Sequence, residues 1–317
     1  MIRTEKLSKT FKVGFKGKKV PALTGLDIAV GEGEIFGFLG PNGAGKTTTI
    51  KLLMGLIYPT SGKAWLMGEE LGNTSVKNKI GFLPENPYFY DYLTGSEFLN
   101  FYGQLFGLKR DERKYRLEKL LALVGMEGAK GIQLRKYSKG MLQRIGIAQA
   151  LINDPKLVIL DEPMSGLDPI GRKEVRDIIL NLKDKGKTVF FSTHILPDVE
   201  MICDRVGTLI KGKLRDIGPL EELLDTQVKN IDITVRGLSE TGLNKAESLV
   251  NKVIKREDTT FFSTENEEVA DRVLKIIDEE KGRLVSFVPQ MESLEEHFMK
   301  QAEGNKAVGI ESNGSSY

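Results

Sequence analysis

The chain has 317 residues, of which 46 are Lys or Arg and 44 are Asp or Glu, so its formal net charge is only +2. This length suits two domains of ordinary size, and the single cysteine, Cys203, excludes an internal disulfide. No run approaches the roughly 18 apolar residues that span a bilayer, and the first residues contain no signal-peptide core, so we expect a cytosolic chain.

Glycine and charge both divide the chain near residue 220. Only six of the 34 glycines lie beyond that point. Residues 221–317 contain 12 Lys and Arg against 20 Asp and Glu, whereas residues 1–220 carry a balance of +10. The basic part has no base-stacking motif and no long basic block, so we expect polyphosphate or an anionic membrane surface as its partner and no nucleic acid. An ordinary solvated surface is the alternative.

A glycine-rich loop, GPNGAGKT, stands between a predicted strand over residues 33–39 and a predicted helix over residues 47–56. A strand, then GxxxxGK(S/T), then a helix is the context of a phosphate-binding P-loop, in which backbone N–H groups surround the phosphate oxygens. Lys46 would reach the β- and γ-phosphates, and the Thr47 hydroxyl would ligate Mg²⁺. The alternative is a plain surface turn. The predicted nucleotide-binding residues here are Gly40, Pro41, Asn42, Gly43, Ala44, Gly45, Lys46, Thr47 and Thr48.

Residues 156–163 contain an apolar strand that ends in two adjacent carboxylates, Asp161 and Glu162. Two carboxylates are costly to bury together unless a cation lies beside them. Mg²⁺ on a nucleotide would supply that cation. Asp161 would hold the metal, directly or through water, and Glu162 would polarise the water that attacks the γ-phosphate. Solvated acids at an ordinary strand end are the alternative.

A further predicted strand, residues 187–193, ends at His194. A lone histidine is often structural, but open α/β sheets place their ligands at the carboxyl ends of the strands. We therefore expect His194 to contact the γ-phosphate, with a structural role as the second interpretation.

Two more motifs complete an ordered set. Residues 137–144 (YSKGMLQR) begin a helix that continues over 145–152, and residues 165–168 (SGLD) follow the carboxylate strand. The set, spread over about residues 3–220, resembles the nucleotide-binding subunit of an ATP-binding cassette (ABC) transporter. The resemblance assigns Walker A to 40–47, a Q-loop to about 81–85, the signature to 137–141, Walker B to 157–162, the D-loop to 165–168 and the switch histidine to 194.

The resemblance implies an α/β P-loop ATPase domain over residues 1–220, with a helical subdomain at about 90–155. It implies ATP and Mg²⁺ as ligands, Glu162 and His194 as catalytic residues, and a separate integral-membrane permease that keeps the chain at the cytoplasmic face of the membrane. It also implies a paired ATPase subunit or a homodimer, in which Ser138 and Gly140 of one chain close on the nucleotide of the other.

Three positions bear on how far the family pattern applies. Glu85 replaces the Q-loop glutamine, yet it could still ligate Mg²⁺ as a hard oxygen donor. Lys139 adds a cation to the signature. Phe11 is the candidate for the aromatic residue that stacks on adenine, and a core phenylalanine is the other interpretation.

Eight of the 24 aromatic residues lie within residues 88–106. In the resembling family this region borders the groove that receives a short cytoplasmic helix of the membrane subunit, and aromatic residues are enriched at interfaces. We interpret the segment as part core and part docking surface. Its aromatic residues are Tyr88, Phe89, Tyr90, Tyr92, Phe98, Phe101, Tyr102 and Phe106.

The segment over residues 221–302 predicts a small α+β, ferredoxin-like domain of order βαββαβ with an added helix. The predicted elements are a strand over 231–236, a helix over 243–250, a hairpin ending in a strand over 259–263, a helix over 267–277, a strand over 283–288 and a last helix over 293–299. This layer resembles the accessory region of two-component, ABC-2 exporters. Residues 303–317 are predicted to be a disordered tail.

The leading hypothesis is an ATPase subunit that powers a separate permease through ATP-driven dimerisation. The alternative is a soluble ABC-type ATPase of translation or DNA repair, but this chain has one cassette, with about 115 residues between Lys46 and Asp161. A switch GTPase is disfavoured because the guanine motif NKxD does not occur.

Overall fold

The computed structural model describes residues 1–14, 17–223 and 228–291. The chain forms two compact units, Met1–Leu220 and Glu221–Tyr317, and each is described by itself. Within the described residues no helix is long and apolar enough to cross a membrane.

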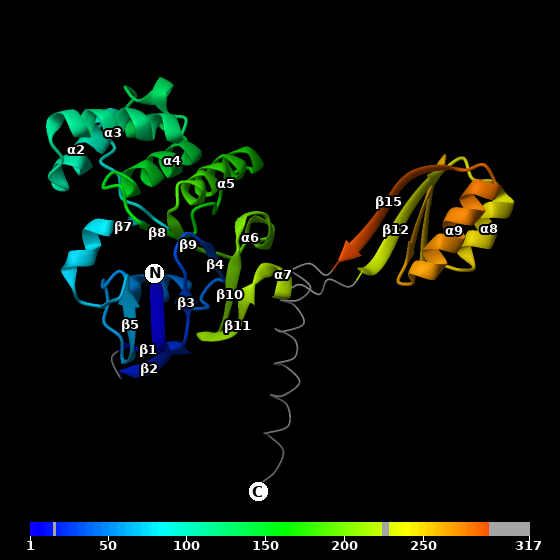
Figure 1. Ribbon diagram of the computed structural model, residues 1–317, viewed down its shortest axis with the longest axis horizontal. Helices are drawn as coiled ribbons and strands as arrows, with labels where there is room; N and C mark the ends of the chain where they lie inside the picture. The colour runs from blue at the N-terminus through cyan, green and yellow to red at the C-terminus, as the bar shows by residue number, and fades with distance from the viewer. Residues whose placement is uncertain (15–16, 224–227, 292–317) are drawn as a thin grey trace, which may run out of the picture. The chain divides into compact units, whose positions relative to one another are not determined.

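A six-stranded, mostly parallel sheet forms the centre of the first unit (Figure 1). Its strand order is β11-β10-β4-β9-β8-β7, and only the β10–β11 pair is antiparallel. Every residue of β4, β8 and β9 is buried, as expected of parallel strands covered on both faces. The strands are β4 (Ile35–Leu39), β7 (Ile80–Leu83), β8 (Leu157–Asp161), β9 (Thr188–Thr193), β10 (Arg205–Ile210) and β11 (Lys213–Pro219).

A second, antiparallel sheet packs with the helix of the P-loop, α1 (Lys46–Leu53), against the central sheet. Its order is β2-β1-β5-β6, with β3 paired to β1. Ile50 and Leu52 of α1 share one fully buried core with Phe36 and Phe38 of β4. The P-loop is therefore anchored by core packing just beyond it. The strands are β1 (Ile2–Val13), β2 (Lys18–Leu26), β3 (Ala29–Val30), β5 (Ser61–Leu66) and β6 (Glu69–Glu70).

The remaining helices of the first unit fall into two groups. The helices α2 (Gly95–Leu105), α3 (Arg110–Leu123) and α4 (Lys139–Ala150) lie together at one end of the unit (Figure 1). The helices α5 (Pro169–Asp184) and α6 (Leu196–Ile202) contact β9 and β4, and α7 (Leu220–Leu223) follows β11. Three short 3-10 helices are η1 (Thr74–Lys79), η2 (Glu127–Ala129) and η3 (Leu134–Lys136).

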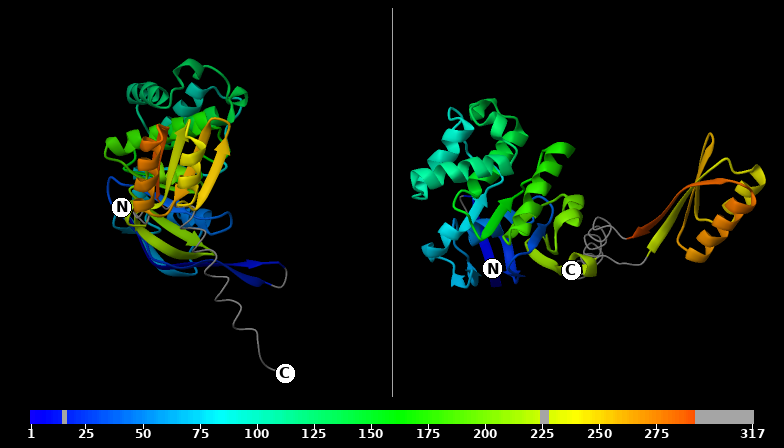
Figure 2. Two further views of the ribbon diagram at one scale, coloured as in Figure 1. Left: turned by 90° about the vertical axis from the view of Figure 1, so that its right-hand side faces the viewer. Right: turned by 45° about the horizontal axis from the view of Figure 1, so that its top comes forward.

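The second unit is a four-stranded antiparallel sheet with two helices on one of its faces (Figure 2). Its sheet order is β13-β14-β12-β15, and α8 and α9 cover a core that includes Ile233 and Phe262. The elements are β12 (Val228–Arg236), α8 (Glu240–Glu247), β13 (Lys252–Arg256), β14 (Thr259–Thr264), α9 (Glu267–Glu279) and β15 (Arg283–Met291). The chain thus runs βαββαβ.

Several expected boundaries differ from the structure by a few residues, and two of the differences have a clear local cause. The strand expected over 33–39 begins at Ile35, because Gly33 adopts a turn with φ of +74°. The helix expected over 243–250 spans Glu240–Glu247 instead, because the Ser239 hydroxyl caps it by accepting a hydrogen bond from the Gly242 N–H. The helix expected over 293–299 and the tail over 303–317 lie outside the described residues.

Candidate nucleotide site

The P-loop follows β4 directly and turns at two crowded glycines. A Cβ on Gly40 would lie 2.3 Å from the Leu209 carbonyl oxygen, and one on Gly45 would lie 2.4 Å from the Ala22 carbonyl oxygen. Gly45 also has a φ of +111° and caps α1. Glycine is required at both positions, since a side chain would collide with backbone. The loop therefore directs the positive end of α1 toward any phosphate that it surrounds.

Lys46 turns its ammonium group inward beneath this loop. Its Nζ donates to the Gly40 carbonyl at 2.6 Å and to the Pro41 carbonyl at 3.3 Å, and it lies 3.0 Å from Glu162 Oε1. Lys46 is only 5% exposed. A buried ammonium needs such partners, and phosphate oxygens would offer stronger ones than the two neutral carbonyls.

Asp161 lies at the end of β8 and is held by hydroxyls from two other elements. Ser192 Oγ donates to Asp161 Oδ1 at 2.6 Å, and Thr47 Oγ1 donates to the same oxygen at 3.3 Å. Burial raises the pKa of Asp161, against the two hydrogen bonds, which lower it. A carboxylate buried in this way is poised for a cation.

Glu162, the next residue, adopts a left-handed backbone conformation with φ of +51°. Its N–H donates to Ser192 Oγ at 3.0 Å, which fixes the backbone at this turn. His194 Nδ1 lies 2.8 Å from Glu162 Oε2, and Lys46 pairs with Oε1. Among the described residues, the Lys46 ammonium is the group that faces Oε1, and Oε1 accepts no well-directed hydrogen bond. Strained backbone of this kind is typical of functional sites.

A cleft beside these residues collects most of the predicted site. It brings Glu85 from the Q-loop position to the P-loop and to Glu162. Ala22 of β2 also lines it, although no sequence pattern singled out this residue. The residues lining the cleft are Ala22, Asn42, Gly43, Ala44, Gly45, Lys46, Thr47, Thr48, Glu85 and Glu162.

Seven predicted residues do not line that cleft. Four of them still contact a residue that does, namely Gly40, Pro41, Asp161 and His194. The other three are Phe11, Ser138 and Gly140. Phe11 lies on β1, is 37% exposed and stacks under the Lys9 ammonium at 5.2 Å from the ring centroid. Its solvent exposure disfavours the core interpretation, and its contact with adenine stays a prediction. Ser138 and Gly140 lie at the start of α4, where Ser138 Oγ accepts a hydrogen bond from the Met141 N–H at 3.2 Å. Their role toward a second nucleotide also stays a prediction.

Lys139 has a partner within its own chain. A Cβ on Gly166 would lie 2.0 Å from Lys139 Nζ, so the lysine occupies the space beside this glycine of the D-loop position. Asp168, two residues on, caps α5 by accepting a hydrogen bond from the Gly171 N–H at 2.7 Å. The cation that departs from the family signature is thus packed against the D-loop.

The aromatic segment over 88–106 divides as the sequence suggested. Phe98 is 1% exposed and packs on Phe89 and Tyr102, whereas Tyr88 and Tyr92 are 83% and 61% exposed. Part of the segment is core, and part is an open aromatic surface.

Ser192 is the site residue that sequence reasoning missed. It is fully buried, and it connects the Asp161 carboxylate to the Glu162 backbone. The available signal was a polar residue near the end of an otherwise apolar strand, on the edge where the other site residues lie.

The oxygen ligands at and beside Asp161 fit a magnesium ion. Mg²⁺ prefers oxygen ligands and is usually held by one or two protein groups together with nucleotide phosphates and water. Thr47 Oγ1 and Asp161 Oδ1 are 3.3 Å apart, and the carboxylate is buried with a raised pKa. The part of the chain that the structure describes contains no cluster of three or more His, Cys, Asp or Glu side chains suited to a metal.

A buried P-loop lysine, a hydroxyl beside an aspartate and a glutamate at the next position define a P-loop ATPase. The family model for ABC transporters matches residues 23–165. An uncharacterised ABC transporter ATP-binding protein of Synechocystis is 45% identical over 95% of this chain and 84% of its own length. The chain therefore belongs to the ATP-binding proteins of ABC transporters, and it is an ATPase that binds ATP.

Further matches agree with this family. The bacitracin transport ATP-binding protein of Bacillus licheniformis is 44% identical over 62% of this chain and 65% of its own length. A solved ATP-binding subunit of an ABC transporter has a TM-score of 0.61 at 32% identity, covering 70% of this chain and 91% of that one. A dimeric cassette bound to ADP and phosphate has a TM-score of 0.63 at 24% identity, covering 69% of this chain and 99% of that one. At this identity the match shows only that the folds are similar.

Proposed function

We propose that this chain hydrolyses ATP to power transport by a separate integral-membrane permease of the exporter-like, ABC-2 class, at the cytoplasmic face of the membrane. The relatives support this proposal, because one is named for bacitracin transport and another, from Mycobacterium tuberculosis, for fluoroquinolone export. The exposed aromatic surface at Tyr88 and Tyr92 is the docking surface that we assign to the permease.

The arrangement of Lys46, Glu162 and His194 carries the chemical part of the proposal. In the structure both oxygens of Glu162 face cations or N–H donors, with Lys46 at 3.0 Å and His194 at 2.8 Å. When ATP enters, Lys46 exchanges Glu162 for the β- and γ-phosphates. Glu162 Oε1, released from Lys46, then accepts a proton from the attacking water, while His194 holds Oε2.

Magnesium would be held by Thr47 and Asp161, and Glu85, which lines the same cleft as Thr47, would be a further oxygen ligand. Bound there, the metal would neutralise charge that develops on the phosphates. The chain itself would hold the two ligand oxygens, Thr47 Oγ1 and Asp161 Oδ1, in place. Ser192 does so for Asp161 through a buried hydrogen bond of 2.6 Å.

The proposed cycle needs two ATPase subunits. Ser138 and Gly140 begin α4 and offer a hydroxyl and backbone N–H groups to an anion, yet they do not line this chain's own cleft. We assign them to the nucleotide of a second subunit, so that ATP favours the closed dimer and hydrolysis releases it.

Purification and reconstitution test the transporter role. The chain is expressed together with a membrane protein encoded beside its gene, solubilised in detergent and purified by a tag on the ATPase. The proposal predicts that a membrane-spanning protein copurifies and that the pair hydrolyses ATP faster in vesicles than the isolated chain does. Copurification with ribosomes or with DNA and no membrane protein would instead favour the soluble ABC ATPase.

Lys46→Ala serves as the matched control for that experiment. It should abolish hydrolysis while the permease still copurifies, because the docking surface does not include the P-loop. Tyr88→Ser together with Tyr92→Ser should do the reverse, releasing the permease while the isolated chain still hydrolyses ATP.

A further inference from the structure

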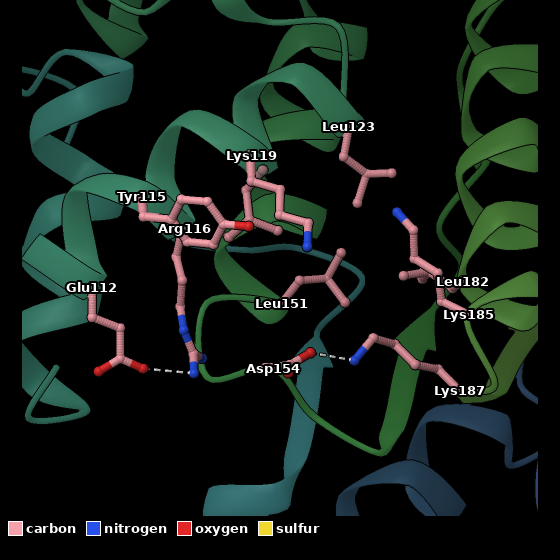
Figure 3. Close-up of a pocket in the computed structure, with 11 residues that line it drawn as sticks. Glu112, Tyr115, Arg116, Lys119, Leu123, Leu151, Asp154, Leu182, Lys185 and Lys187 are labelled. Carbon is pink, nitrogen blue, oxygen red and sulfur yellow. Dashed lines mark hydrogen bonds and ion pairs between the residues drawn. The ribbon is translucent and has the colours of Figure 1, made fainter.

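A pocket of about 310 Å³ lies on the first unit, away from the nucleotide cleft (Figure 3). One wall is a face of α3. The opposite wall is the end of α5 and the segment leading into β9, and the connection from α4 to β8 lies between the two walls. The pocket lies where β8 and β9 begin, whereas the ATPase residues lie where they end. Its lining residues are Glu112, Tyr115, Arg116, Lys119, Leu120, Leu123, Leu151, Asp154, Leu182, Lys185 and Lys187.

The floor of the pocket is apolar. Leu120, Leu151 and Leu182 are 9%, 4% and 1% exposed, and Leu123 is half-buried among them. The Tyr115 ring stands at the rim and is 65% exposed. An apolar floor of this size suits a short hydrocarbon chain or a single ring, since pockets for small ligands begin at about 300 Å³.

The rim of the pocket carries four cations and two anions, and two of the cations are already paired. Arg116 Nη2 lies 2.8 Å from Glu112 Oε1, and Arg116 Nη1 donates to the Ile152 carbonyl at 3.0 Å. Lys187 Nζ lies 2.5 Å from Asp154 Oδ1 and donates to the Pro155 carbonyl. Both carboxylates of the rim are therefore neutralised.

Lys119 and Lys185 are the two remaining cations. Neither has an ion pair with any residue that the structure describes. Lys119 approaches the face of the Tyr115 ring, at 5.8 Å from the centroid, and its charge also helps to lower the pKa of Asp154. In Figure 3 the two lysines reach into the pocket from its opposite walls, with Leu123 and Leu151 between them. The pocket thus has an excess of two positive charges above a leucine floor.

We propose that this pocket binds an anionic amphiphile, a molecule with one carboxylate or phosphate group and a short apolar chain or ring. Lys119 and Lys185 hold the anion between them, and Leu120, Leu151 and Leu182 cover the apolar part. Charge complementarity decides the headgroup, because an anion replaces water around two ammonium groups while Glu112 and Asp154 keep their own partners. The pocket is separate from the ATP site and does not depend on the proposed transport role.

Calorimetric titration of the full-length chain with soluble amphiphiles tests the proposal. The probes are octanoate and octyl phosphate, both below the concentration at which they form micelles. Both should bind with saturation, butanoate should bind more weakly because it covers less of the floor, and octanol and inorganic phosphate should not bind measurably. Binding should persist in Lys46→Ala, which excludes the P-loop as the site of octyl phosphate.

Paired variants locate the binding site. Lys119→Gln and Lys185→Gln should each weaken the binding of octanoate about tenfold, as expected for the loss of one charged hydrogen-bond partner. The matched control is Lys114→Gln with Lys173→Gln, which removes exposed lysines of the same two helices that do not line the pocket. All four lysines are exposed, so folding is checked by circular dichroism and should not change.

Three results would overturn the proposal. Absence of saturable octanoate binding would leave the lysines as an ordinary solvated surface. Equal binding of octanol and octanoate would reduce the pocket to a nonspecific apolar patch. Sedimentation with vesicles that contain an anionic phospholipid, lost in the lysine variants while no soluble amphiphile binds, would assign the two lysines to adsorption on a membrane surface.

Discussion

Lys46 and Glu162 form a buried ion pair, with 3.0 Å between Nζ and Oε1 and side chains only 6% and 5% exposed. Such a pair is costly to bury and adds little net stability, because desolvation offsets most of the attraction. The presence of this pair at the end of β8 is better explained by a ligand that takes the place of Glu162 beside Lys46. Phosphate oxygens can take over Lys46, and the exchange leaves Glu162 with an uncovered acceptor beside the reacting water.

Glu162→Gln should bind ATP but hydrolyse it at least about 10²-fold more slowly, because an amide cannot accept the proton of the attacking water. Nucleotide binding is measured with a fluorescent ATP analogue and turnover by phosphate release. Lys46→Ala should instead lose binding, and Glu118→Gln, an exposed change on α3, should alter neither. A wild-type turnover rate in Glu162→Gln would remove Glu162 as the base.

Asp161→Asn should stabilise the nucleotide-free chain while abolishing magnesium-dependent hydrolysis. Burial raises the pKa of Asp161, so the folded state disfavours the charge that the residue carries at neutral pH. Removing this cost should raise the Tm, and in a domain of this size each 1 kcal/mol corresponds to about 2–4 °C. Ser192 can still donate to the amide oxygen.

The difference in Tm between Asp161→Asn and the wild type should depend on pH. Because the folded pKa is raised above the ordinary value of 3.8, the cost is complete at neutral pH and disappears as the pH falls through the folded pKa toward 3.8. The Tm advantage of Asp161→Asn should therefore shrink on acidification. Asp154→Asn is the control, and its difference in Tm should have the opposite sign, because the hydrogen bond from Lys187 lowers the pKa of Asp154. A constant difference at every pH would contradict the account.

Much of the ATPase site could be predicted because its chemistry is local in sequence. GPNGAGKT fixes a loop whose glycines are crowded by backbone, and adjacent carboxylates after an apolar strand indicate a cation site. The contact of His194 with Glu162 could not be predicted, because β9 and β8 are brought together only by sheet pairing, in which Asp161 lies opposite Ser192. Ser192 was missed for the same reason.

Positions set by tertiary packing were the least predictable. Lys139 looked like an added charge near the nucleotide, but the structure packs its amine against Gly166, which no local pattern indicates. The start of α8 depended on the Ser239 cap, whose hydroxyl competes with the apolar spacing that placed the helix three residues later. The pocket beside Lys119 and Lys185 arises from three separate segments and leaves no periodic signal.

Glu85 should tolerate Gln but not Ala if it serves as a ligand on the metal side of the cleft. An amide oxygen can still coordinate Mg²⁺, so Glu85→Gln should keep ATPase activity within about threefold, whereas Glu85→Ala should need more magnesium for half-maximal rate. The measurement is a magnesium titration of hydrolysis at fixed ATP. Identical titration curves for wild type and Glu85→Ala would give Glu85 a purely structural role.

Ser138→Arg should block ATP-driven dimerisation without affecting ATP binding to the isolated chain. Ser138 and Gly140 begin α4, which lies in the helical subdomain outside the chain's own cleft, so a second subunit is needed to bring them to a γ-phosphate. Glu162→Gln is the background of choice, because it stalls before hydrolysis. With ATP and Mg²⁺ its sedimentation profile should shift to a dimer, and adding Ser138→Arg should abolish that shift. Ser248→Arg, at the exposed C-cap residue that follows α8, is the control and should leave the shift intact.

The second unit complicates this test, because it offers another surface on which two chains could meet. Repeating the measurement on residues 1–220, the first compact unit, separates the two contacts. The shared-site mechanism predicts that the truncated Glu162→Gln protein still dimerises with ATP and that Ser138→Arg still prevents it. If the truncated protein binds ATP yet stays monomeric at every concentration, with or without its membrane partner, then Ser138 and Gly140 do not complete the nucleotide site of a second chain.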